Sequence, residues 1–229
     1  MAATLFDFSN TALKKDYKGY YVKVIDNVFT PEECDELIAL AESDQKWKVA
    51  AVNYGPGRYD NYVDTDYRNS QRILLFDQKA ADKIQERILP LVPELVKIEP
   101  GDEWETIVAA RGRLRKTWEL AGVNERLSFL RYEKGNYFRP HCDGPLRLPD
   151  GRQAGVTLQV YLGDEGVKGG ATRILGSKDK YVDIEPKKGR VLIFQQRGLY
   201  HSGEDVIKGV KYTLRSDFMY HVKNPDTSD

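Results

Sequence analysis

Two histidines and one aspartate have the side-chain types and spacing that could hold a metal ion. His141 and Asp143 lie two residues apart, so on a β-strand their side chains would share one face while Cys142 would point to the other. His201 lies far along the chain. Two neutral imidazoles and one carboxylate, with other coordination positions open, are typical of non-haem iron(II) centres. Because a His-x-Asp pair is common by chance, two surface histidines beside a turn aspartate are the alternative interpretation.

The segments that must position these residues read as short strands separated by Gly, Pro and Asp, about eight of them. They cover residues 127–132, 137–143, 155–162, 171–175, 181–184, 190–194, 198–201 and 210–220. This texture predicts a sandwich or jelly roll, a fold that brings distant strands side by side. His141 and Asp143 would end one strand and His201 another. The third histidine of the chain, His221, would lie past the last strand and on the surface.

The N-terminal part reads differently, as helices joined by longer loops. Thr30, Pro31 and Glu33 form a helix start with a capping box, which predicts a helix over 31–43. Strands are expected at 20–29 and 71–76, a second amphipathic helix at 80–91, and a long loop at 51–70 that could act as a lid. Residues 94–124 are ambiguous, with some helical character around 106–116. We therefore expect one α+β domain over 1–229, with a jelly-roll (double-stranded β-helix) core at about 127–222 and N-terminal helices packed against it.

Composition narrows the classes of partner and compartment. The 35 basic and 35 acidic residues cancel, and no stripe of basic and aromatic residues is visible, so a nucleic-acid partner is not expected. No apolar run is long enough for a transmembrane helix, and the first residues do not read as a signal peptide. With two cysteines, a disulfide framework is not expected. We expect a cytoplasmic or nuclear protein that is not secreted and binds no membrane; its oligomeric state stays open.

Several further blocks accompany His141, Asp143 and His201 in a recognisable order. They are Leu130–Gly135, Pro140–Asp143, Gln159–Leu162, Gly169–Thr172, Pro186–Phe194 and Gly209–Tyr212, with an opening block at Asp26–Cys34. In these blocks the sequence resembles the prolyl 4-hydroxylase-like branch of the 2-oxoglutarate-dependent dioxygenases. The match is specific for the family and says little about the substrate.

The resemblance implies a set of cofactors and residue roles. The cofactors would be Fe(2+), 2-oxoglutarate as cosubstrate and O2, with ascorbate as an optional addition. His141, Asp143 and His201 would bind the iron. Lys211 would bind the far carboxylate of 2-oxoglutarate, because an ammonium suits a point contact with one carboxylate. The phenols of Tyr132 and Tyr161 would bind the cosubstrate, as would Thr157, which shares a strand face with Tyr161. No catalytic side chain is expected beyond the metal centre, and Asp143 argues against halogenation.

Five further polar residues are candidates for the substrate side of the site. Arg215 would face the barrel interior if Lys211 does, where it could bind an anionic substrate group or support Asp143. Residues 51–70 and 144–155 are expected to flank the mouth, and Asn69, Arg72, Arg147 and Arg152 are the residues there that could bind a carboxylate.

The substrate itself stays open between two classes. We favour a small molecule such as an amino acid or specialised metabolite, because the chain shows no secretory signal and no separate peptide-binding domain. The alternative is a cytosolic or nuclear peptidyl-prolyl hydroxylase. A non-catalytic jelly-roll binding module, or a cupin-like zinc protein, would tolerate the histidines but would have no use for Lys211 together with Tyr161.

Overall fold

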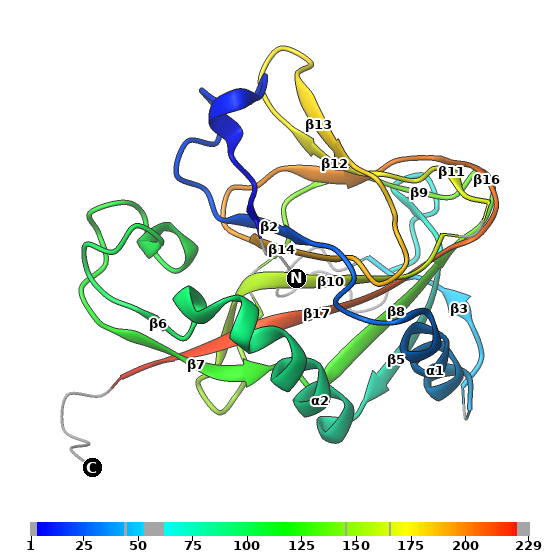
Figure 1. The fold of residues 1–229 in the computed structure, drawn as a ribbon, viewed down its shortest axis with the longest axis horizontal. Coiled ribbons are helices and arrows are strands. Elements are labelled where there is room, and N and C mark those ends of the chain that lie inside the picture. The colour runs from blue at the N-terminus through cyan, green and yellow to red at the C-terminus, as the bar shows by residue number, and fades with distance from the viewer. Residues whose placement is uncertain (1–3, 44, 53–61, 145, 165, 224–229) are drawn as a thin grey trace.

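Two antiparallel sheets face each other, and two α-helices cover the outer side of the larger sheet (Figure 1). This arrangement is seen in a computed structural model that describes residues 4–43, 45–52, 62–144, 146–164 and 166–223. Within these ranges, no helix is long and apolar enough to cross a lipid bilayer.

The larger sheet runs in the order β1-β2-β14-β10-β17-β8-β5-β3, with β7 also paired to β17 and β6 paired to β7. Its strands are β1 (Thr4–Leu5), β2 (Val22–Ile25), β3 (Lys48–Val49), β5 (Gln71–Phe76), β6 (Lys97–Ile98), β7 (Trp118–Val123), β8 (Arg126–Tyr132), β10 (Gln153–Gly163), β14 (Val191–Gln195) and β17 (Lys211–Val222). The strands β2, β3 and β5 come from the N-terminal part, so that part extends the sheet as well as covering it.

The smaller sheet runs in the order β13-β12-β15-β9-β4. Its strands are β4 (Arg68–Asn69), β9 (Tyr137–His141), β12 (Thr172–Leu175), β13 (Tyr181–Ile184) and β15 (His201–Gly203), and a separate pair is formed by β11 (Lys168–Gly169) and β16 (Val206–Lys208). From β8 to β17 the chain passes back and forth between β14-β10-β17-β8 and β13-β12-β15-β9. This winding is the predicted jelly roll, or double-stranded β-helix.

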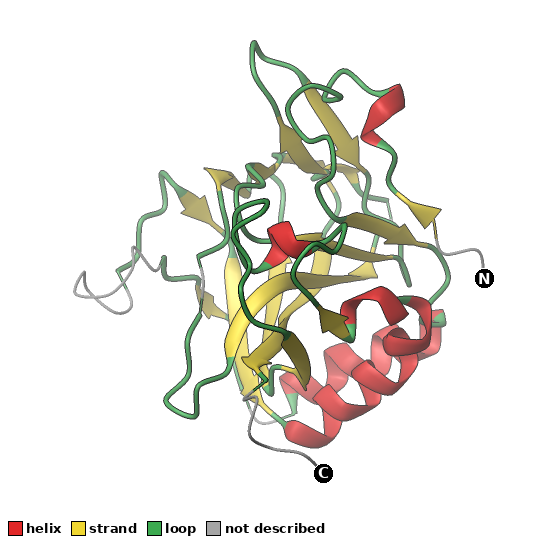
Figure 2. Cartoon of the chain, turned by 90° about the vertical axis from the view of Figure 1, so that its left-hand side faces the viewer, coloured by secondary structure: helices red, strands yellow, loops and turns green. Residues whose placement is uncertain are grey.

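The helices α1 (Pro31–Glu42) and α2 (Gln78–Ile88) lie on the side of the larger sheet that faces away from the smaller one (Figure 2). The predicted capping box is present, because Thr30 accepts from the backbone of Glu33 and the Glu33 carboxylate accepts from that of Thr30. Four 3₁₀ turns complete the helical structure in the described ranges: η1 (Phe8–Asn10), η2 (Leu89–Leu91), η3 (Pro93–Leu95) and η4 (Glu105–Ile107).

Strand β10 shows how the sequence divides the outside of the barrel from its inside. Val156, Leu158 and Val160 are fully buried in the apolar cluster that also contains residues of both helices. The alternate residues Thr157 and Gln159 point the other way and line an internal cavity. Because side chains alternate along a strand, one face of β10 packs the helices while the other faces the site.

Several element ends differ from the expectations. Strand β9 ends at His141, so Asp143 lies in the following loop, and His201 begins β15 where it was expected to end a strand. The helix suggested around 106–116 is only the turn η4. His221 is exposed but lies inside β17, whose pairing with β7 carries the strand further than predicted. In the expected lid 51–70, residues 53–61 lie outside the described residues, and Arg68–Asn69 form β4.

Candidate metal centre

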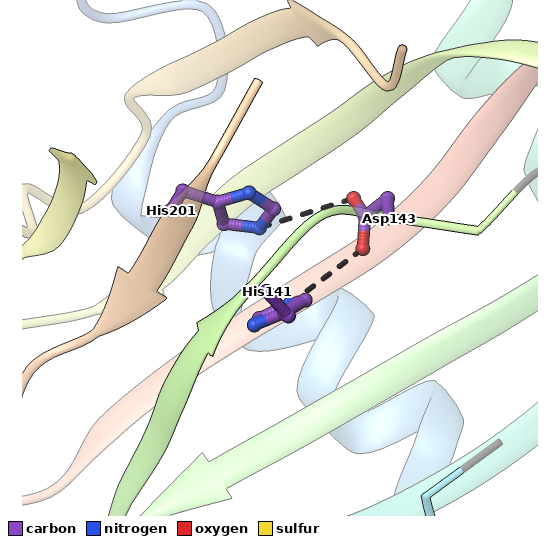
Figure 3. A group of neighbouring side chains, drawn as sticks. All are labelled: His141, Asp143 and His201. Carbon is purple, nitrogen blue, oxygen red and sulfur yellow. Dashed lines mark ion pairs between the residues drawn. The ribbon is translucent and has the colours of Figure 1, made fainter. Parts of the chain in front are cut away.

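His141, Asp143 and His201 converge between the two sheets, and one ligand atom from each lies within 4.8 Å of the others. Figure 3 shows both imidazoles directed at the carboxylate. The Nε2 atoms of His141 and His201 lie 3.7 and 4.0 Å from the two carboxylate oxygens of Asp143. The histidines meet because His141 and His201 are direct partners across the β9–β15 pair. The structure therefore brings together the three residues that the sequence singled out.

Backbone carbonyls fix which nitrogen of each imidazole faces the centre. Nδ1 of His141 lies 2.8 Å from the Arg139 carbonyl oxygen, and Nδ1 of His201 lies 3.3 Å from that of Leu199. A carbonyl oxygen can only accept, so each Nδ1 carries the proton and donates it. Each Nε2 is then left with a free lone pair directed at Asp143. This is the tautomer that a metal-binding histidine requires.

The protonation states at neutral pH also suit a cation. Burial lowers the pKa of His141 to about 3, helped by the neighbouring His201, and burial likewise lowers the pKa of His201. Burial alone would raise the pKa of Asp143, but Arg215 and the two histidines outweigh it and hold that pKa below its ordinary value. Two neutral imidazoles therefore surround an ionised carboxylate, which is the state that binds a divalent metal without first losing protons.

Side chains of the larger sheet contact Asp143, although this residue follows a strand of the smaller sheet. The Thr157 hydroxyl donates to Asp143 Oδ2 at 2.5 Å, and Arg215 Nη2 lies 3.2 Å from the same oxygen. Arg215 also pairs with Asp217 at 3.1 Å, and Asp217 accepts from Gln196 at 2.7 Å. Of the two roles left open for Arg215, the contacts match support of Asp143. Thr157 contacts the candidate metal ligand and also lines the cavity, so its expected contact with the cosubstrate stays a prediction.

The three residues border a cavity of about 750 Å³ between the sheets. Lys211 also lines it, is only 2% exposed, and lies with its Nζ 4.3 Å from the centre of the Tyr132 ring. The ammonium donates to the Gly170 carbonyl at 2.7 Å and forms no ion pair with any carboxylate of the described ranges. One cavity thus holds a candidate metal centre and a buried cation that lacks a counterion.

Comparison with known proteins identifies the domain. Residues 127–216 match the model of the 2OG-Fe(II) oxygenase superfamily. Residues 127–216 are a 2OG-Fe(II) oxygenase domain. The chain is 27% identical to "Prolyl 4-hydroxylase 1" of Arabidopsis thaliana over 213 residues, which is 83% of this chain and 65% of the relative. It is 31% identical to "Probable prolyl 4-hydroxylase 11" of the same plant over 170 residues, which is 72% of this chain and 49% of that relative.

A solved structure supports the fold of this oxygenase domain. The viral collagen prolyl hydroxylase of Paramecium Bursaria Chlorella virus-1 superposes with a TM-score of 0.56 at 21% identity, over 90% of this chain and 99% of that chain. The family resemblance read from the sequence is therefore confirmed, as is the jelly-roll core. Membership of the 2OG-Fe(II) oxygenases implies Fe(2+), 2-oxoglutarate and O2, and ascorbate is typical of the family. The donor set of two neutral imidazoles and one carboxylate fits iron(II).

The two tyrosines expected at the cosubstrate of the oxygenase have different positions. Tyr132 lines the cavity beside Lys211, as expected. Tyr161 does not line it: its ring is fully buried among apolar side chains, and its hydroxyl donates to Thr172 at 2.7 Å. The hydroxyl of Tyr161 thus reaches a residue that lines the cavity, and its contact with the cosubstrate stays a prediction.

Of the four residues expected near the mouth of the barrel, only two line the cavity. Arg72 and Arg147 line the cavity. Asn69 and Arg152 are not among the residues that line it, and their assignment to the substrate side stays a prediction. Asn69 lies in the short strand β4, and Arg152 pairs with Glu125 and Asp150 at 3.1 and 2.7 Å. Arg152 therefore stabilises its loop through two ion pairs outside the cavity.

Other lining residues of the oxygenase site were not singled out from the sequence. They include Arg68, Arg126, Gln159, Thr172 and Asp217. Arg126 could have been found, because it shares the inner face of β8 with Tyr132 by strand alternation. Asp217 could have been found in the same way on β17, two residues beyond Arg215. Arg68 carried no such signal, since its strand β4 is only two residues long.

Proposed function

We propose that the protein is an iron(II)- and 2-oxoglutarate-dependent dioxygenase that hydroxylates an unactivated C–H bond. One observation carries the proposal: His141, Asp143 and His201 converge in the same cavity that contains the unpaired ammonium of Lys211. A non-catalytic binding module would not need both features. When bound, iron(II) and 2-oxoglutarate supply the oxidation of a C–H bond by O2, with release of succinate and CO2.

The protein's own residues would position these groups. The two Nε2 atoms and the Asp143 carboxylate would hold the iron, and Lys211 would bind the far carboxylate of 2-oxoglutarate. Thr157 and Arg215 keep the Asp143 carboxylate oriented toward the histidines. The ring of Phe138 stacks on His141 at a centroid distance of 3.7 Å, which fixes the imidazole plane and keeps water from that side.

Two substrate classes compete within this proposal. The relatives are named prolyl 4-hydroxylases, which favours a prolyl residue in a peptide. The lining of the cavity, with its surplus of positive charge, favours a small acidic molecule such as an amino acid or a specialised metabolite. We propose the small molecule as the substrate and keep the peptide as the alternative.

Anaerobic titration with iron(II) and 2-oxoglutarate tests the proposal. The wild-type protein should develop the weak visible charge-transfer band of the iron–2-oxoglutarate chelate. Asp143→Ala and His201→Ala should lose the band and lower succinate formation more than about 100-fold, because even indirect disturbance of metal ligands costs 10–100-fold.

His221→Ala is the matched control, since this histidine is exposed and lies outside the site. It should keep both the band and the turnover. A well-folded wild-type protein that binds iron(II) and 2-oxoglutarate without the band, or an Asp143→Ala variant with full turnover, would refute the assignment.

A further inference from the structure

The cavity carries more positive charge than iron and 2-oxoglutarate can use. Six basic side chains line it: Arg68, Arg72, Arg126, Arg147, Lys211 and Arg215. The carboxylates among the lining residues are Asp143 and Asp217, and both pair with Arg215. Iron(II) and the 2-oxoglutarate dianion carry equal and opposite charges, so binding the two together leaves the surplus unchanged.

Apart from Arg147, which is exposed, three of these arginines form no ion pair among the described residues. Arg68 is 8% exposed, with its guanidinium 4.5 Å from the centre of the Phe138 ring. Arg68 and Arg72 each donate a long hydrogen bond of 3.4 Å to the same acceptor, the Ala51 carbonyl oxygen. Arg126 is half-buried and forms no ion pair. Burying a charge without a partner is costly, so three neighbouring unpaired guanidinium groups are expected only where a ligand supplies the negative charge.

Arg72 is repelled by the other arginines that line the cavity, and it shares its Ala51 acceptor with Arg68. Burial, together with the nearby charges of Arg68, Arg126 and Arg215, lowers the pKa of Arg72 to about 10. Burial and Arg215 likewise lower the pKa of Arg126. An anion placed among these groups would relieve the repulsion and would pair with several N–H donors at once.

Strand register separates Arg126 from the position of Lys211. On the inner face, Lys211 is opposite Tyr132, whereas Arg215 is opposite Ser128 and Arg126 lies two residues further along β8. At roughly 3.3 Å per residue, Arg126 is about 20 Å along β8 from Tyr132. Arg126 is therefore near the level of Thr157 and Asp217, which are opposite each other beside the metal centre. Arg72, by contrast, is opposite Leu130, only two residues from Tyr132. The arginines therefore extend from beside Lys211 toward the metal centre.

We propose that Arg68, Arg72 and Arg126 form an anion site that binds a carboxylate of the substrate. The proposal rests on the function proposed above and specifies its substrate class. A planar carboxylate matches the paired N–H donors of a guanidinium group, and several such groups converge here. The carboxylate could belong to a free amino acid or to an acidic side chain in a peptide, so the experiment must distinguish the two sources.

Calorimetric titration of the protein loaded anaerobically with iron(II) and 2-oxoglutarate tests the site without turnover. The probes are the free L-amino acids with their primary amides, N-acetyl-L-proline with its amide, and blocked Pro-Glu and Pro-Gln dipeptides. At least one acid should bind ten times more tightly than its amide. A preference among the free acids would identify a small-molecule substrate, and a preference for Pro-Glu over Pro-Gln alone would identify a peptide.

Arg72→Gln and Arg126→Gln should each reduce that preference at least tenfold while leaving the affinity for 2-oxoglutarate within twofold. The unchanged 2-oxoglutarate affinity shows that each variant is folded. Arg115→Gln is the matched control, since Arg115 bonds only backbone carbonyls and does not line the cavity. The anion site is refuted if no acid binds more tightly than its amide, or if both variants weaken 2-oxoglutarate instead. Failure of the proposed function would appear separately, as absence of the charge-transfer band before any probe is added.

Discussion

The buried ammonium group of Lys211 can bind an anion inside the barrel. Burial lowers its pKa to about 8, although Glu204 and Glu185 pull the other way. Its protonated form is the one that binds a carboxylate, and that form is lost as the pH rises through 8. We predict that the dissociation constant for 2-oxoglutarate rises about tenfold per pH unit above pH 8. Anaerobic titrations in the presence of manganese(II), between pH 7 and pH 9, measure this.

A variant separates the effect of Lys211 from that of the metal. Lys211→Met should weaken 2-oxoglutarate at pH 7 and remove the pH dependence, while the affinity for manganese(II) alone stays the same. If the wild type and the variant show the same pH dependence, another group in the cavity binds the far carboxylate.

Individual site residues differed in how far the sequence could predict them. His141, Asp143, His201 and Lys211 were identified by spacing and family pattern, and the structure places all four around one cavity. Arg126 was missed although it shares the inner face of β8 with Tyr132, because an arginine is usually on the surface. Arg68 was missed because its strand β4 is too short to show a pattern. The sequence therefore predicts the chemistry of the metal centre better than the recognition of the substrate.

Helix α1 contributes stability from the side of the sheet opposite the site. Its first turn depends on the reciprocal bonds between Thr30 and Glu33. We predict that Thr30→Ala lowers the free energy of unfolding by about 1 kcal/mol, as measured by urea denaturation. The affinity for 2-oxoglutarate should not change, because α1 packs on the outer face of β10.

Glu36→Ala is the control for this change, since Glu36 is exposed in the same helix and its removal should cost less than about 0.5 kcal/mol. A loss of 2-oxoglutarate affinity in Thr30→Ala would show instead that α1 communicates with the cavity.

Element types were predicted more accurately than element ends. The helix over 31–43 and most of the jelly-roll strands are present, because alternation and capping signals are local. The end of β9 was wrong by two residues. Asp143 is drawn out of the strand by Thr157 and Arg215, which belong to other strands and are distant in sequence. Contacts of this kind are visible only once the sheets face each other.

Across the whole molecule, the candidate metal centre ties the two sheets together. Its histidines come from β9 and β15 in the smaller sheet, and Asp143 is fastened to β10 and β17 in the larger one. A metal that binds only the folded chain stabilises it by about 2.7 kcal/mol at a free concentration one hundred times its dissociation constant. We predict that manganese(II) raises Tm and that a chelator reverses the increase, as measured by calorimetry.

The same titration on Asp143→Ala should give a much smaller increase in Tm at the same metal concentration. An equal increase in the variant would mean that manganese(II) binds the folded protein elsewhere.

The jelly-roll topology that brings the two sheets together was predictable from the order of the family motifs. The pairing of the N-terminal strands β3 and β5 with the larger sheet was not, because it depends on contacts far apart in the sequence.

The direct pairing of His141 with His201 has a consequence for how the chain folds. A slip of one residue between β9 and β15 would turn one imidazole to the opposite face of the sheet. The slipped pairing would keep most of its backbone hydrogen bonds but would lose the binding site. Iron present during folding would therefore bind only the correct alignment of the two strands. The metal would stabilise that alignment over the slipped one before it takes part in any reaction.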